Sequence, residues 1–260
     1  MLKVKTGAEI EILRQNNLLV SKTLAEVGKM IRPGITTLDL DTRAEEFIRD
    51  HHAIPGFKGY HGFPNTLCTS VNSQVVHGIP SKYRLKEGDI ISVDCGVIKD
   101  GYYGDSAFTF EVGNVDEKIR KLLRVTRESL WKGVSEAVAG RRVGDIGYAV
   151  QFHAEQNGFS VVREMVGHGL GSELHEPPEV PNYGRRGRGP RLPEGLVICI
   201  EPMINMGVKE IVQDTDGWTI RTKDKMPSAH FEFALVVSKG KADVLTNFDY
   251  IDKVLNKNNI

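Results

Sequence analysis

A ten-residue segment occurs twice in the chain, and this repeat constrains the fold more than any other feature. Leu85–Asp94 (LKEGDIISVD) matches Leu192–Glu201 (LPEGLVICIE), so the acid that ends one strand-like run falls on the acid that ends the other. Helix-like segments before these runs also match, at a shift of 106 residues: Leu13, Leu24, Gly34, Asp39 and Leu40 fall on Ile119, Leu130, Gly140, Asp145 and Ile146. We therefore predict a single domain, residues 1–260, built from two similar α/β halves of about 1–112 and 113–260.

Local signals indicate the elements of each half. Thr6 and Glu9 form a Thr-x-x-Glu capping box, and a helical apolar period follows until Pro33-Gly34. A second helix is expected over about 37–52. Strand-rich segments follow each helix pair. The pattern predicts an α+β class, with a curved and mostly antiparallel sheet that has helices on one side.

Two acids interrupt neighbouring apolar strands. Asp94 lies in Ile90–Val97 and Asp105 in Tyr102–Phe110, and residues 98–101 form the turn between them. If Ile98 and Gly101 close the turn, the two acids pair directly; a two-residue Asp100-Gly101 turn places them on one face, one diagonal apart. Facing carboxylates repel each other. A divalent cation would remove this repulsion, so the pair suggests a metal site.

Three further ligand-type residues follow. Glu201 ends an apolar strand over 196–204, Glu232 interrupts a strand over 230–237, and His168 lies in GHGLG at 167–171. A buried, unpaired glutamate is costly unless it is protonated, paired or metal-bound. Mixed oxygen and nitrogen donors suit a pair of Mn, Fe, Co or Zn ions. The alternative interpretation is that these residues form structural ion pairs. This interpretation is weaker for all five residues together than for a single strand glutamate.

Bulk properties narrow the class of protein. Lys+Arg and Asp+Glu are both 34, so no net charge attracts DNA or a membrane surface. Cys68, Cys95 and Cys199 are scattered in or beside apolar runs, which is typical of a reducing compartment. The first residues lack the apolar stretch of a signal peptide, and no run approaches 18 apolar residues. We expect a cytoplasmic protein.

The order of ligand-type residues, together with VVHGIP, GHGLG-x-x-LHE-x-P, IEPM and a late FE, resembles a type I methionine aminopeptidase. The resemblance implies the duplicated pita-bread fold and covers the chain from the first helix to Val237. It implies two divalent metal ions, one held by His168 and Glu201 and the other by Asp94. Asp105 and Glu232 would bridge both ions.

The resemblance also implies the remaining site residues. Glu201 would carry a proton, and His77 and His175 would donate hydrogen bonds to the substrate. The methionine side chain would lie among aromatic and thiol groups: Tyr60, His61, Phe63, Cys68 and Trp218. Leu174 stands where the family commonly has an aromatic residue. Only 30 residues separate Glu201 from Glu232, which leaves no room for the insertion of type II enzymes.

The implied activity is removal of the initiator methionine from peptides and nascent chains when residue two is small. Other enzymes remain possible: a proline-specific peptidase of the same fold, usually with a large extra N-terminal domain, or a non-catalytic binding relative that has lost ligands. The basic loop 183–191 suggests a transient ribosome contact, against the alternative of a solvated surface loop. We expect a monomer.

Overall fold

The computed structural model describes residues 2–257, which form five α-helices, one 3₁₀ helix and fifteen short strands. The α-helices are α1 (Gly7–Gly28), α2 (Thr37–Asp50), α3 (Glu117–Glu136), α4 (Val143–Gln156) and α5 (Asp249–Lys257), and the 3₁₀ helix is η1 (Tyr60–Gly62). The strands of the first half are β1 (Ile54–Pro55), β2 (Leu67–Val71), β3 (Gln74–Val76), β4 (Ile90–Lys99) and β5 (Tyr102–Glu111). The later strands are β6 (Ser160–Val161), β7 (Gly167–Gly169), β8 (Glu176–Val180), β9 (Val197–Ile200), β10 (Met203–Asn205), β11 (Ile211–Gln213), β12 (Ile220–Thr222), β13 (Ser228–His230), β14 (Phe233–Val236) and β15 (Asp243–Val244).

The first helix begins as its sequence predicts and ends earlier. Thr6 and Glu9 form the complete capping box, which confirms the predicted start. The helix ends at Gly28 rather than at Pro33-Gly34, so the predicted end is wrong. A Cβ at Gly28 would lie 2.9 Å from a ring carbon of Phe110. The position therefore needs glycine for packing on the sheet, and glycine is a weak helix former.

Strands β4 and β5 form a ten-residue antiparallel ladder that is closed by a two-residue turn. Asp100 and Gly101 both have positive φ, 52° and 78°, as a type I′ turn requires. Lys99 pairs with Tyr102, so Asp94 lies opposite Ala107, and Asp105 lies opposite Gly96. The two acids are therefore one diagonal apart, and the alternative in which they pair directly is wrong.

The other two acids lie where predicted continuous strands are broken. The 196–204 run divides into β9 and β10, and the 230–237 run divides into β13 and β14. Ile200 pairs with Phe233 and Met203 with His230, in one continuous register that places Glu201 opposite Glu232. Pro202 has no N–H to continue the ladder. The Glu232 N–H instead donates to the Ala107 carbonyl of β5 (2.9 Å), which joins the second pair of acids to the first.

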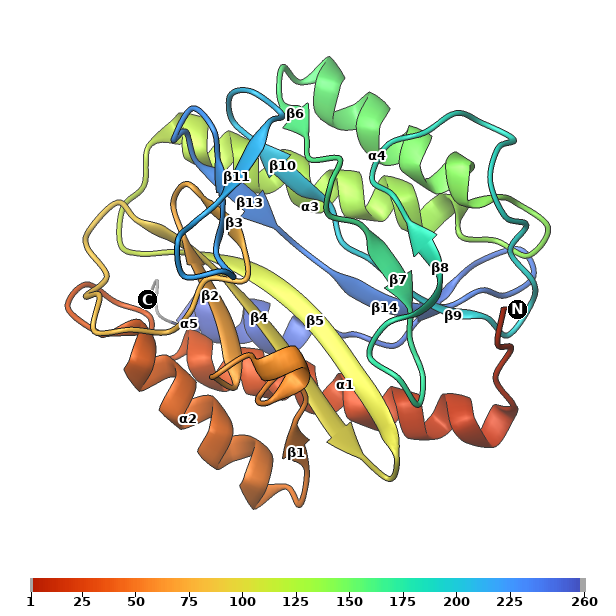
Figure 1. Cartoon of the computed structure of the whole chain (residues 1–260), viewed down its shortest axis with the longest axis horizontal. Coiled ribbons are helices and arrows are strands. Elements are labelled where there is room, and N and C mark those ends of the chain that lie inside the picture. Colours follow the sequence, from red (N-terminus) through yellow and green to blue (C-terminus); the bar gives the residue numbers. More distant parts are fainter. Residues whose placement is uncertain (1, 258–260) are drawn as a thin grey trace.

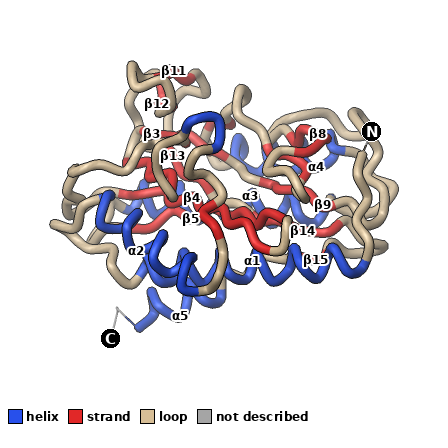
Figure 2. The backbone as a smooth tube through the Cα atoms, turned by 60° about the horizontal axis from the view of Figure 1, so that its bottom comes forward, coloured by secondary structure: helices blue, strands red, loops and turns tan. Residues whose placement is uncertain are grey.

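The helices cover one side of the strands. Figure 1 shows α1, α2 and α5 beside the strands of the first half, and α3 and α4 beside those of the second half. Figure 2 shows β11 and β12 extending as a hairpin from the body of the molecule, away from α5. Phe108, Phe110 and Phe231 belong to the main apolar core, which the helices close. Within residues 2–257 no helix is long and apolar enough to cross a bilayer.

Candidate metal centre

The predicted site residues lie around one cavity of about 340 Å³. Its walls come from strands and loops, and no α-helix contributes to them. All twelve residues of the predicted site line this cavity: Tyr60, His61, Phe63, Cys68, His77, Asp94, Asp105, His168, His175, Glu201, Trp218 and Glu232. Leu174 lines it as well. The structure therefore brings the whole predicted set together, while the role of each residue stays a prediction.

The ligand-type atoms form a compact cluster. One oxygen of Asp105, one of Glu232, a His168 nitrogen and the Cys199 sulfur all lie within 4.8 Å of one another. His168 Nε2 is 3.7 Å from an oxygen of Asp105 and 3.5 Å from Glu201 Oε1. Asp94 lies one diagonal from Asp105 on the β4–β5 ladder, and its charge raises the pKa of Asp105.

Burial controls the protonation of this cluster. Desolvation raises the pKa of Asp94 to about 7 and the pKa of Glu201 to about 8. It also raises the pKa values of Asp105 and Glu232 well above the usual range, and the neighbouring carboxylates raise them further. In His168, burial lowers the pKa to about 3, so the ring is neutral at pH 7. Without a cation the protein therefore holds protons on its acids and a free lone pair on its imidazole.

These residues fit a group of divalent cations. Asp94 Oδ1, Asp105 Oδ1 and Glu232 Oε1 are inaccessible to solvent and have no hydrogen-bond partner among the described residues. Buried polar atoms are nearly always paired, so three such carboxylate oxygens around one cavity need a positive partner. The Nδ1 of His168 lies 3.0 Å from the Gly169 carbonyl, which makes Nδ1 the donor. Nε2 is then left with a lone pair that faces the carboxylates, as a metal-binding imidazole requires.

Two more histidines border the cavity. Burial lowers the pKa of His77 to about 4, and burial also lowers the pKa of His175. The Tyr60 hydroxyl lies 2.8 Å from His175 Nδ1, and the rings of His168 and His175 meet at 90° with centroids 4.4 Å apart. A neutral histidine has one N–H to donate. When Tyr60 donates to Nδ1, the remaining N–H of His175 is on Nε2.

The aromatic residues form one wall. The rings of Phe63 and Trp218 meet edge to face, with centroids 5.1 Å apart. Cys68 belongs to the same buried apolar cluster as Phe63 and Leu174, and Tyr60 and Trp218 pack against this cluster. The acids thus lie at one side of a cavity whose other side is apolar.

Two residues of the cluster were missed by sequence reasoning. Cys199 precedes Glu201 by two positions, and its sulfur lies within 4.8 Å of a Glu232 carboxylate oxygen. His230 precedes Glu232 by two positions, and its Nε2 lies 3.6 Å from Glu201 Oε2. Side chains two apart in an extended strand point to the same face. That periodicity, applied from each glutamate, is the signal that would have found both residues.

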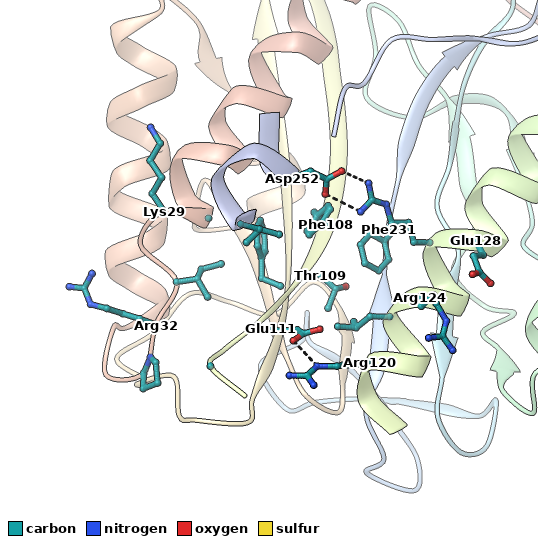
Figure 3. Close-up of a pocket in the computed structure, with 18 of the residues that line it drawn as sticks. Lys29, Arg32, Phe108, Thr109, Glu111, Arg120, Arg124, Glu128, Phe231 and Asp252 are labelled. Carbon is teal, nitrogen blue, oxygen red and sulfur yellow. Dashed lines mark hydrogen bonds and ion pairs between the residues drawn. The ribbon is translucent and has the colours of Figure 1, made fainter. Parts of the chain in front are cut away.

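A second cavity, of about 930 Å³, lies on the helix side of the strands (Figure 3). It is bordered by residues of α1, β5, α3 and α5, and its lining includes Phe108, Phe231 and several arginines. Among them, Arg127 makes a bidentate ion pair with Asp252 (3.0 and 2.6 Å), and Arg120 lies 3.4 Å from Glu111. It contains no histidine or cysteine. Within residues 2–257, the one group of ligand-type side chains close enough together to hold a metal ion is Asp105, His168, Cys199 and Glu232, at the smaller cavity.

Comparison with known proteins first defines the class. Residues 11–239 match the model of metallopeptidase family M24. Solved structures share the fold even at low identity. An Xaa-Pro dipeptidase from Bacillus anthracis is 20% identical with a TM-score of 0.74, and this chain covers 62% of its length. That likeness concerns the fold alone.

Other relatives match over their whole length. A methionine aminopeptidase from Clostridium acetobutylicum is 50% identical over 247 residues, which is 95% of this chain and 99% of the relative. The crystal structure of methionine aminopeptidase from Rickettsia prowazekii has a TM-score of 0.94 at 41% identity, and covers 95% of this chain and 100% of its own. The chain therefore belongs to the methionine aminopeptidases of metallopeptidase family M24. The predicted family and its pita-bread fold are confirmed, and membership in a metallopeptidase family supports the predicted divalent metal ions.

Proposed function

We propose that the protein removes the N-terminal methionine from peptides and nascent proteins when the second residue is small. The observation that carries the proposal is a cavity with partnerless carboxylates on one side and an apolar, aromatic wall on the other. The carboxylates suit divalent cations and a positively charged terminus, and the wall suits an unbranched thioether. The relatives at 41–50% identity bear the name of this activity.

The five predicted ligands would hold the metal ions. His168 and Glu201 would bind one ion, Asp94 the other, and Asp105 and Glu232 both, as the family resemblance implies. When bound, such ions lower the pKa of the water that they hold towards ~7 and polarise a carbonyl group. The raised pKa values of the four acids support the assignment, because a bound cation would displace their protons and remove the repulsion between them.

The residues of the chain would supply proton transfer and substrate orientation. Glu201 would take a proton from the attacking water and pass it to the leaving amine, since its carboxylate lies beside the cavity. His77 and His175 would donate hydrogen bonds to the peptide and to the oxygen that gains charge. Tyr60 would keep His175 in the required tautomer through the 2.8 Å contact with Nδ1. Tyr60, His61, Phe63, Cys68 and Trp218 would surround the methionine side chain.

Peptide specificity tests this proposal directly. The metal-loaded protein should cleave Met-Ala-Ser, should cleave more slowly as residue two grows to Leu or Arg, and should leave acetyl-Met-Ala-Ser intact. The acetylated peptide is the matched control, because it lacks only the charge that the four carboxylates would attract. Faster cleavage of an Xaa-Pro peptide would favour the proline-specific alternative. No cleavage and no bound metal would favour a binding protein.

We further propose a cytoplasmic monomer whose two halves divide near residue 112. The helix pairs support this division, since α1 and α3 have 22 and 20 residues and α2 and α4 have 14 each. Sedimentation velocity tests the monomer, and fractionation of cells tests the location.

The basic loop supports a transient contact with ribosomal RNA. All four of its arginines are exposed: Arg185, Arg186, Arg188 and Arg191. The loop packs on the start of α4 through a hydrogen bond from Gly144 N–H to the Arg188 carbonyl, and the Arg186 guanidinium lies 4.7 Å from the Tyr148 ring centre. Replacing the four arginines by Ser should weaken co-sedimentation with ribosomes at low salt and leave peptide hydrolysis unchanged. Unchanged co-sedimentation would mean that the loop is an ordinary solvated surface loop.

A further inference from the structure

A second buried imidazole lies beside the proposed metal centre, and the function described above gives it no role. His230 is 1% exposed, and it is absent from the lining of the 340 Å³ cavity. Its backbone is fixed on both sides: the His230 N–H donates to Thr109 Oγ1 (2.9 Å), and the Thr109 hydroxyl donates to the His230 carbonyl (2.7 Å). These bonds hold the backbone of His230 in β13, and its side chain is not part of the cavity lining.

His230 and His168 approach the two oxygens of one carboxylate. His168 Nε2 lies 3.5 Å from Glu201 Oε1, and His230 Nε2 lies 3.6 Å from Glu201 Oε2. The Nε2 of His230 is buried and has no hydrogen-bond partner among the described residues. A buried polar nitrogen without a partner is costly, so a nearby acceptor indicates the bond that it is placed to make.

The two imidazoles differ in the proton that Nε2 carries. In His168 the Gly169 carbonyl accepts from Nδ1, so Nε2 holds a lone pair and cannot donate to Glu201. Around His230 the nearby charged groups are carboxylates, Glu201 at 3.6 Å and Asp94. When Glu201 and Asp94 are ionised, as metal binding would make them, their oxygens only accept, so His230 would then bond to Glu201 with the proton on its Nε2.

We propose that His230 is a positioning residue, which donates its Nε2–H to Glu201 Oε2 and so turns Oε1 toward His168 and the metal position. This inference rests on the proposed function, in which Glu201 both binds metal and carries a proton. The separation of 3.6 Å is slightly longer than a hydrogen bond, and catalytic hydrogen bonds commonly shorten once ligands are bound. Partners of this kind orient ligands and typically change affinity or activity by roughly 10–100-fold when removed.

Three substitutions of His230 test whether this residue positions Glu201, binds metal itself or only fills space. His230→Leu removes the donor, His230→Gln keeps an amide N–H at a similar reach, and His230→Asn carries the same amide one methylene shorter. His153→Leu is the matched control, because His153 makes a 2.8 Å imidazole–carboxylate contact with Glu128, away from the cavity. Each variant is examined for kcat and KM on Met-Ala-Ser, for metal content by mass spectrometry, and for the visible spectrum of the Co²⁺-loaded protein.

Positioning predicts a specific pattern. His230→Leu should lower kcat by roughly 10–100-fold with KM nearly unchanged and metal content intact. His230→Gln should recover most of the rate, His230→Asn should not, and the Co²⁺ spectrum should shift in the Leu and Asn variants only. The His153→Leu control should match the unmodified protein in all measurements.

Two outcomes would overturn the inference. Loss of metal from all three His230 variants would make His230 a ligand, and unchanged kcat and spectrum in the Leu variant would leave it a packing residue. If the Leu variant does not fold, the comparison of Gln with Asn answers the question, since both are polar and contain the same amide. A protein that is inactive on Met-Ala-Ser refutes the proposed function instead, and its Co²⁺ spectra still report whether His230 orients Glu201.

Discussion

Two cavities of this molecule border the same strands from opposite sides, and they differ in how their acidic side chains are paired. On the helix side, the larger cavity contains Arg127 paired with Asp252 and Arg120 beside Glu111 (Figure 3). In the smaller cavity, buried oxygens of Asp94, Asp105 and Glu232 lack any partner within the described chain. The cavity with these acids is the smaller of the two, at about 340 Å³, whereas the helix-side cavity has about 930 Å³. Buried acids with strongly raised pKa values and partnerless oxygens, rather than cavity size, therefore indicate where this chain performs chemistry.

The largest expected effect concerns the acids shared by both metal positions. Asp105→Asn or Glu232→Gln should reduce kcat at least tenfold under metal-replete conditions, because each removes a charge that two cations would share. The fold should persist, since the neutral side chain also removes carboxylate repulsion in the metal-free protein. Steady-state kinetics with metal analysis measures the first effect, and thermal unfolding with EDTA measures the second. Activity above a tenth of the original would contradict the bridging assignment.

Substitution of His77 tests the substrate side of the same cavity and leaves its four acids unchanged. His77→Ala should lower kcat on the order of 10²-fold, as expected for one hydrogen bond made in the transition state. Metal content should not change, because His77 is proposed to contact the substrate and not the ions. Mass spectrometry of the purified variant decides the point: a loss of stoichiometric metal would make His77 a ligand.

The pH dependence of stability should separate the metal-free from the metal-loaded protein. Burial raises the pKa of Asp94 to about 7 and of Glu201 to about 8, above their values in an unfolded chain. The stability that these protonated acids contribute is present at low pH and is lost as pH rises through those values. The Tm of the metal-free protein should therefore fall from about pH 4, where the acids of the unfolded chain titrate, to about pH 8, by roughly 5 °C or more, and should level off above that pH. The metal-saturated protein is the control, and a flat metal-free profile would mean that the acids are not held protonated.

The sequence could predict this site because most of its information is local. The repeat of Leu85–Asp94 at Leu192–Glu201 places an acid at the end of each of two apolar strands, and such acids conflict with an apolar core. Register was less certain, since two turns fitted the same residues. The positive φ of Asp100 decided between them.

The remaining features depend on contacts between distant segments. The break at Glu201 has a local cause, because Pro202 has no N–H for the ladder, but at Glu232 the N–H bonds to β5, 125 residues earlier at Ala107. The pairing of His230 with Glu201 depends on the same tertiary arrangement, and so do the ion pairs of the helix-side cavity. Strand propensity alone predicts continuous runs there, because it contains no information about which strand lies alongside.

The smallest expected effect comes from the helix-side cavity, and it is the most direct test of the comparison. Arg127 and Asp252 are each about one-third exposed (35% and 33%), so their ion pair should contribute no more than about 1 kcal/mol. Replacing both, as Arg127→Met with Asp252→Leu, removes the charges together and keeps an apolar stem over Phe108 and Phe248, where the Arg127 guanidinium now lies 5.8 and 5.5 Å from the ring centres. We expect the Tm to change by about 2–4 °C and kcat to stay within about twofold.

This test is informative because the same chain segments line both cavities. Phe231 lines the helix-side cavity and directly precedes Glu232, and Phe108 lies on the strand that carries Asp105. A disturbance of the ion pair that moved either ring would therefore reach an acid of the metal centre within a few residues. A tenfold fall in kcat with an unchanged Tm would show that the paired charges hold the proposed ligand acids in place. In that case the balanced cavity, too, would be part of the functional site.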